Sequence, residues 1–294
     1  MRLSIISIIF TAVGVYGQVS RFNFHRGKIH ESKLEIVLSF LIHPSFCDKT
    51  LWLKELSPKD VGSYHTDAFN KLGEIYKTKK PRNKIDAMKD VANIVSAYCP
   101  IDDFECKANA HMKVLDEFHS VQSGLKEIKF PDDFDQNARD AMELVLFMVQ
   151  SIDEENIFDV VDRLTQIQSD LENMDDEKGH IMGALATVSV AIESSKLWHS
   201  AINDPEHNLH EIVMMTIGNN RRLQEYNIVF PIYDGAKIVE ADVTSTIIAF
   251  VTTNPANYFQ VVGPAKILVE MVLQSISGSA AMALNTTQSD FLFR

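Results

Sequence analysis

The sequence lacks the patterns that mark the common catalytic and nucleotide-binding sites. It contains no Gly-x-Ser-x-Gly elbow for a serine nucleophile, and its 12 glycines are scattered instead of gathered in a phosphate-cradling loop. We therefore expect no bound cofactor. Positive charge is also scarce, because 28 lysines and arginines face 40 aspartates and glutamates, a formal net charge of -12. Such a chain repels phosphate backbones, so we expect no nucleic-acid partner.

Cysteine is scarce as well, with only Cys47, Cys99 and Cys106 in the chain. None of the three sits two residues from another, which disfavours a metal site built from cysteines. Cys99 and Cys106 flank a short acidic turn and could join the end of one helix to the start of the next. We favour this disulfide. Cys47 would then be a buried thiol or would pair with another chain, although a bond from Cys47 to either of the others stays open.

The N-terminal residues 1–17 have the pattern of a secretory signal peptide. Arg2 precedes an apolar run over 3–15, and the small residue Gly17 follows it. A run of about 13 residues is too short to span a bilayer, which needs roughly 20 helical residues. We therefore predict that the mature protein begins near residue 18 and is secreted. In the extracellular compartment Asn285, which opens the Asn-Thr-Thr triplet, could carry a glycan.

Helical periodicity dominates the rest of the chain. Its clearest instance is an apolar seam with steps of three and four residues, formed by Ile157, Val160, Leu164, Ile167, Leu171 and Met174. Similar patterns and capping signals predict helices over 57–77, 82–98, 102–122, 135–151, 176–202, 208–218, 236–253 and 262–284. In 82–98 the predicted inward residues are Ile85, Met88, Val91, Ala92, Val95 and Tyr98. We predict an all-α, bundle-like array of about eight or nine helices, with 226–233 as an extended connection.

Paired carboxylates occur at three of the predicted helix starts. They are Asp102-Asp103, Asp132-Asp133 and Asp175-Asp176. Acidic side chains favour the electropositive start of a helix, so we interpret them as capping residues.

The last sixty residues have few charges and many small or β-branched residues. In the helix predicted over 262–284, Lys266, Glu270 and Gln274 stand four apart, and Ser275, Ser279 and Ala283 form a row of small residues at the same spacing. Small residues let two helix backbones approach closely. We predict a C-terminal hairpin within 223–294, next to an acidic helical body over 18–222. A single domain containing both is equally consistent with the sequence.

Two groups of residues are candidate metal ligands. His207 and His210 stand three apart beside Glu211, so on a helix the imidazoles and one carboxylate could face a single ion. Their order matches neither zinc-protease pattern, and a polar surface turn is the alternative. Glu177 and His180 match the Glu-x-x-His element of carboxylate-bridged di-iron bundles, which use that element twice.

Three segments together carry a resemblance. Gly62 and His65 lie in 61–69, Ser195 and Trp198 lie in 194–198, and the small-residue hairpin covers 241–283. This arrangement resembles secreted all-helical proteins of uncharacterised activity that carry an early Gly-x-x-His motif, a later Ser-x-x-Trp box and a glycine-alanine-rich C-terminal hairpin. This chain has threonine, isoleucine and valine where that hairpin is usually rich in glycine. The resemblance implies an all-helical fold, and it brings no known activity with it.

These observations favour a secreted, non-enzymatic helical protein that binds or assembles with a partner, either a protein or a small apolar ligand. An alternative is a membrane-active effector that inserts the 236–284 hairpin into a bilayer. A second alternative is a metal-dependent enzyme that uses His207 and His210 or the acid-histidine pair at Glu177 and His180.

Overall fold

Eight α-helices and no strand make up the residues that the computed structural model describes, which confirms the all-α class. The described residues are 56–79, 81, 84–99, 103–120, 128–153, 155–176, 179–211, 213, 235–253 and 264–285. All of them belong to the unit His43–Arg294. The helices are α3 (Asp60–Thr78), α4 (Lys84–Ser96), α5 (Phe104–Ser120), α6 (Gln136–Gln150), α7 (Ile157–Glu172), α8 (His180–Asn203), α10 (Gly235–Thr253) and α12 (Pro264–Asn285).

The helix ends follow the sequence pattern to within about one turn. The predicted signal peptide 1–17, Cys47, most of the predicted helix 208–218 and the connection 226–233 lie outside the described residues.

Carboxylates cap the starts of three helices. Asp135 accepts a hydrogen bond from the backbone N–H of Ala138 at the start of α6 (3.0 Å). Asp103 does the same for Cys106 in α5 (2.8 Å). At α8, Asp176 accepts from two backbone N–H groups, of Ile181 (3.0 Å) and Met182 (2.7 Å). Asp103 and Asp176 therefore have the capping role predicted for them, because each satisfies donors that the first helical turn leaves unpaired.

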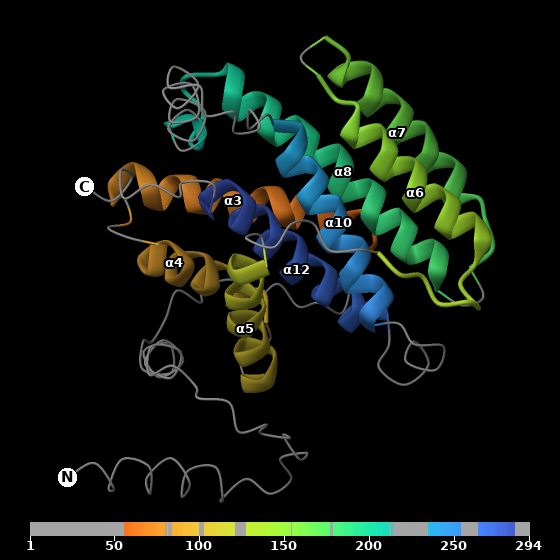
Figure 1. The fold of residues 1–294 in the computed structure, drawn as a ribbon, viewed down its shortest axis with the longest axis horizontal. Coiled ribbons are helices and arrows are strands. Elements are labelled where there is room, and N and C mark those ends of the chain that lie inside the picture. Colours follow the sequence, from red (N-terminus) through yellow and green to blue (C-terminus); the bar gives the residue numbers. More distant parts are fainter. Residues whose placement is uncertain are drawn as a thin grey trace, which may run out of the picture. The chain divides into compact units, whose positions relative to one another are not determined.

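Two helices occupy the interior. Helix α8 is buried around almost its whole circumference and packs against α3, α6, α7 and α10. Helix α12 packs against α10, α3, α4 and α5. Figure 1 shows α6 and α7 side by side next to α8, and α4 and α5 next to α12. A helix that is apolar all round must be enclosed by others, so the nearly uncharged segments form the centre.

The C-terminal segments α10 and α12 form a closely packed pair. In α12 the small residues Ser275, Ser279 and Ala283 are buried, as predicted. The backbones approach so closely that a Cβ atom added at Gly278 would lie 2.1 Å from Ser245 Oγ. Within the described residues, Pro264–Leu284 is long and apolar enough to cross a membrane, but 89% of its most apolar 18-residue window is buried inside the protein.

Two predicted inward residues are exposed instead. Met174 lies beyond the end of α7 and is 42% exposed, while the earlier seam residues Val160, Leu164 and Leu171 are buried. Ile85 lies in the first turn of α4 and is 45% exposed. Both residues lie at a helix end that the described helices leave exposed, and periodicity alone carries no information about coverage there.

Candidate functional site

The most concentrated group of polar side chains is buried where α3, α8 and α10 meet. His65 comes from α3, Ser194 and Trp198 come from α8, and Asp242 comes from α10. Three groups converge on one carboxylate oxygen, Asp242 Oδ2: Ser194 Oγ donates to it, Trp198 Nε1 donates to it at 3.2 Å, and His65 Nε2 lies 3.3 Å away. We call these four residues the buried cluster.

Close contact between α3 and α8 positions His65. A Cβ atom added at Gly62 would lie 2.2 Å from the backbone oxygen of Ser189, so only glycine fits there. The N–H of Gly62 donates to Ser189 Oγ (3.1 Å), and that hydroxyl donates to the carbonyl of Lys59 (2.5 Å). Lys59 offers no side-chain cap to α3, so a serine of another helix satisfies the first turn. One turn further on, His65 points into the interior.

Aromatic rings close the cluster on its α3 side. Phe69 contacts His65, with ring centroids 4.9 Å apart, and meets Trp198 edge to face at 5.1 Å. These contacts exclude water from Asp242, and a carboxylate in such surroundings is stable only when donors or a cation face it. The indole N–H and the serine hydroxyl donate hydrogen bonds to that carboxylate, and the imidazole lies at ion-pair distance from the same oxygen.

The arrangement is suited to packing and not to nucleophilic catalysis. An activated serine needs a hydrogen bond to its base, whereas Ser194 donates to the carboxylate and not to His65. The side chains of all four residues are essentially inaccessible to solvent, so no substrate reaches them in this conformation. The cluster therefore joins three helices through buried charge and hydrogen bonds.

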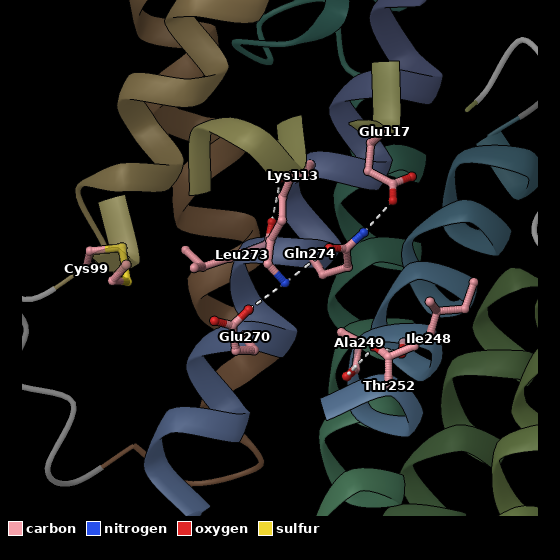
Figure 2. A network of polar contacts seen from close by, with 11 residues as sticks. Cys99, Lys113, Glu117, Ile248, Ala249, Thr252, Glu270, Leu273 and Gln274 are labelled. Atoms are coloured by element: carbon pink, nitrogen blue, oxygen red, sulfur yellow. Dashed lines mark hydrogen bonds and ion pairs between the residues drawn. A yellow bond between two sulfur atoms is a disulfide. The ribbon is translucent and has the colours of Figure 1, made fainter. Parts of the chain in front are cut away.

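A second polar group joins α5 to α12, as Figure 2 shows. Lys113 Nζ pairs with Glu270 at 2.5 Å and donates to Gln274 Oε1 at 3.4 Å, while the Gln274 amide donates to Glu117. The residues stand four apart on each helix, so both pairs lie on facing stripes. The predicted row of Glu270 and Gln274 therefore contacts another helix.

The predicted metal ligands His207 and His210 each make a local hydrogen bond. His207 Nδ1 accepts from the backbone N–H of Leu209 (3.2 Å), and His210 Nδ1 lies 2.9 Å from the carbonyl of Ala201, to which it donates. Partial burial is the main cause that lowers the pKa of His207. Glu211 is exposed next to them. Among the described residues, no three His, Cys, Asp or Glu side chains form a group that could hold a metal ion.

His180, the other candidate, is buried at the start of α8. Its Nδ1 accepts from the backbone N–H of Asp135 (2.9 Å), and its ring stacks on Phe134 with centroids 4.4 Å apart. Its predicted companion Glu177 lies outside the described residues. The described contacts of His180 therefore anchor the start of α6.

Cys99 and Cys106 form a disulfide in the structure, with Cα atoms 5.7 Å apart. This is the pairing favoured from the sequence, and it links the end of α4 to the first turn of α5. Asn285 is the last residue of α12, and the rest of its acceptor triplet lies outside the described residues.

Asp242 is the residue that sequence reasoning missed. The available signal was its position as the last acid before more than twenty residues without any charge. The three segments that carried the resemblance do meet here, because His65 and Trp198 both contact Asp242 of the hairpin. Comparison of the chain with protein-family models, with curated proteins and with solved structures found no match.

Proposed function

We propose that this chain is a secreted, non-enzymatic protein that binds or assembles with a partner protein through its helical surface. The observation that carries the proposal is the outer face of α6, where Leu144 and Phe147 are exposed, Phe147 by 68%. The opposite face of the same helix, with Met142, Val145 and Val149, is fully buried. A helix that is already anchored needs no second apolar face, so this one is available for a partner.

Other large rings support the same proposal. Phe104 at the start of α5 is 74% exposed, and Phe158 at the start of α7 is 66% exposed although its ring also touches His199. Aromatic residues, phenylalanine among them, are enriched in the cores of protein interfaces. Burying one such ring contributes about 1–3 kcal/mol to binding. The polar side chains that could take part in a reaction, by contrast, lie in the buried cluster.

Site-specific photo-crosslinking tests the proposal. A photoreactive phenylalanine analogue replaces Phe147 in the full chain, and the same analogue at Gln166, an exposed polar position of α7, is the matched control. We expect a discrete adduct of one size from position 147 in extracellular fluid of the producing organism and none from position 166. Absence of an adduct from positions 104, 147 and 158 alike would contradict the proposal. Recovery of the chain from cytosol with Met1 retained would contradict its export.

A specific observation favours a second candidate, the membrane-active effector. Helix α12 has the length and apolar character of a membrane span over 21 residues. The experiment is dye release from anionic vesicles between about pH 5 and about pH 7.5, the range in which histidine charge changes. Release that accompanies loss of protease protection of 235–285 would support this candidate. Vesicles that retain their dye, together with a 235–285 segment that stays protected from protease over the whole pH range, would eliminate the membrane-active candidate.

A further inference from the structure

The net negative charge of the chain comes from one part of the sequence. Residues 131–176, which contain α6 and α7, have 14 aspartates and glutamates against two arginines, a net charge of -12. The other 248 residues have 26 acids and 26 bases. The pair of helices α6 and α7 is therefore strongly acidic, whereas the charges of the rest of the chain are balanced.

The exposed apolar side chains of the proposed interface lie within this acidic part. Phe147 is in the last turn of α6 and Phe158 is in the first turn of α7, on either side of the short connection 151–156. Figure 1 shows the two helices side by side. Leu144 stands three residues before Phe147 and therefore lies on the same face of α6.

Carboxylates lie on the same helical stripes as these rings. Asp140 and Glu143 stand seven and four residues before Phe147, and Asp162 stands four residues after Phe158. All three carboxylates are exposed. The apolar side chains are therefore flanked by negative charge along both helices.

Few cations oppose this charge. Arg139 of α6 pairs with Glu143 at 2.8 Å, and Lys59, which precedes α3, pairs with Glu172 of α7 at 2.5 Å. Both pairs lie at the surface, where ion pairs are weak. The face repels a second copy of itself, a nucleic acid and an anionic membrane. An occupant must therefore be positively charged and must offer apolar side chains to the exposed rings.

We infer that the outer face of α6, flanked by the start of α7, binds a basic amphipathic segment of a partner protein. Lysine and arginine side chains of that segment face the three carboxylates, and its apolar side chains cover Leu144 and Phe147. The apolar contacts supply the affinity, while the charges raise the association rate and select against acidic partners. This inference rests on the proposed function, because it gives the chemistry of the partner at the same face.

Fluorescence anisotropy with three labelled peptides of about 18 residues tests the inference on the full chain. The first peptide has leucine and lysine at helical spacing, the second has glutamine in place of leucine, and the third has glutamate in place of lysine. We expect the first peptide to bind at least about tenfold more tightly than the others at about 50 mM salt, and more weakly at about 500 mM salt.

Two variants test the apolar part of the face. Phe147→Ser should weaken binding of the leucine-lysine peptide at least about tenfold, because it removes the ring that the peptide covers. Phe104→Ser makes the same exchange at an exposed ring of α5, outside the acidic segment, and should leave binding unchanged. Both side chains are exposed, so the variants test the surface and not the fold.

Two triple variants test the charges. Asp140→Asn, Glu143→Gln and Asp162→Asn together should weaken binding at least about fivefold at about 50 mM salt and have little effect at about 500 mM salt. The matched control exchanges three exposed acids outside 131–176, Glu74→Gln, Asp116→Asn and Glu206→Gln. It should change the affinity by less than about twofold.

Equal losses in the two triple variants would show that only net charge matters and would overturn the inference. So would failure of the leucine-lysine peptide to bind, or binding that Phe147→Ser leaves unchanged. A dimer that Phe147→Ser dissociates would make a second copy the occupant and would also overturn it. The photo-crosslink at position 147 separates this inference from the proposed function. A discrete adduct whose yield the acidic triple variant leaves unchanged would support the proposed function and overturn only the basic chemistry of the partner.

Discussion

Replacing Gly278 by alanine sets two opposing effects against each other. In a helix interior, alanine is more favourable than glycine by about 1 kcal/mol, so propensity alone predicts a more stable protein. The structure predicts the opposite, because the new Cβ would lie 2.1 Å from Ser245 Oγ and 2.7 Å from Ser245 Cβ. The second atom is fixed to the backbone of α10, so the two helices must separate.

The size of the effect follows from that geometry. Overpacking of a well-packed core costs about 1–3 kcal/mol, and a clash with a backbone-fixed atom between two buried helices belongs at the upper end. After the gain in propensity is subtracted, Gly278→Ala should lower the free energy of unfolding by about 2 kcal/mol. Urea denaturation, followed by far-ultraviolet circular dichroism, measures this as a lower midpoint at an unchanged slope.

A second substitution makes the prediction specific. Ser245→Gly removes both clashing atoms, and the nearest remaining atom to the new Cβ is then the Ala241 carbonyl oxygen at 3.5 Å, an ordinary contact. Ser245→Gly alone should cost about 0.5 kcal/mol in helix propensity. The double variant should recover the whole loss, because only the opposing propensity effects remain, and this gives a coupling energy of about 3 kcal/mol. Additive effects, or a stabilised Gly278→Ala variant, would refute the close approach of α10 and α12.

Three further predictions concern other parts of the fold. Gly62→Ala should lower the free energy of unfolding by about 2 kcal/mol, and Ser189→Gly should not rescue it in urea denaturation, because the clashing atom at 2.2 Å is a backbone oxygen. Burial lowers the pKa of His111 to about 4. The unfolded chain therefore binds this proton near pH 6.5 and the folded chain does not. Stability should fall by about 1–2 kcal/mol between pH 6.5 and 4, allowing for partial exposure, and His111→Gln should remove that part of the pH dependence of unfolding. Replacing Cys99 and Cys106 by alanine opens a loop with a sequence separation of 7 and should cost about 2.5 kcal/mol, and an unchanged thermal midpoint would contradict this.

Local patterns predicted the helices well because the signals are local. The apolar seam of 157–174 and the acidic caps Asp103 and Asp176 act within one or two turns of the chain. The same locality explains the errors at Ile85 and Met174, since whether a helix end is covered depends on residues far away in the sequence. The disulfide was predictable because only a short turn separates its cysteines.

The buried cluster could not be assembled from the sequence in the same way. His65 and Asp242 are separated by more than half the chain. Considered alone, either residue could equally well lie on the protein surface. The candidate ligands near His207 illustrate the converse. They are neighbours in the sequence and resemble a metal-binding site, yet their described contacts are hydrogen bonds to backbone groups of nearby residues. Proximity along the chain was a poor guide to convergence in space.

Local sequence signals are enough to specify that this chain forms helices, where most of them begin and end, and that its C-terminal segments are apolar enough to need burial. These properties depend on backbone propensity, capping and periodicity, which each segment carries alone. The central position of α8 and α12, and the placement of Asp242 against His65, Ser194 and Trp198, depend on how the helices pack together. The reason is physical: burying a carboxylate is favourable only when donors from several helices meet it at once, and no segment alone can supply them.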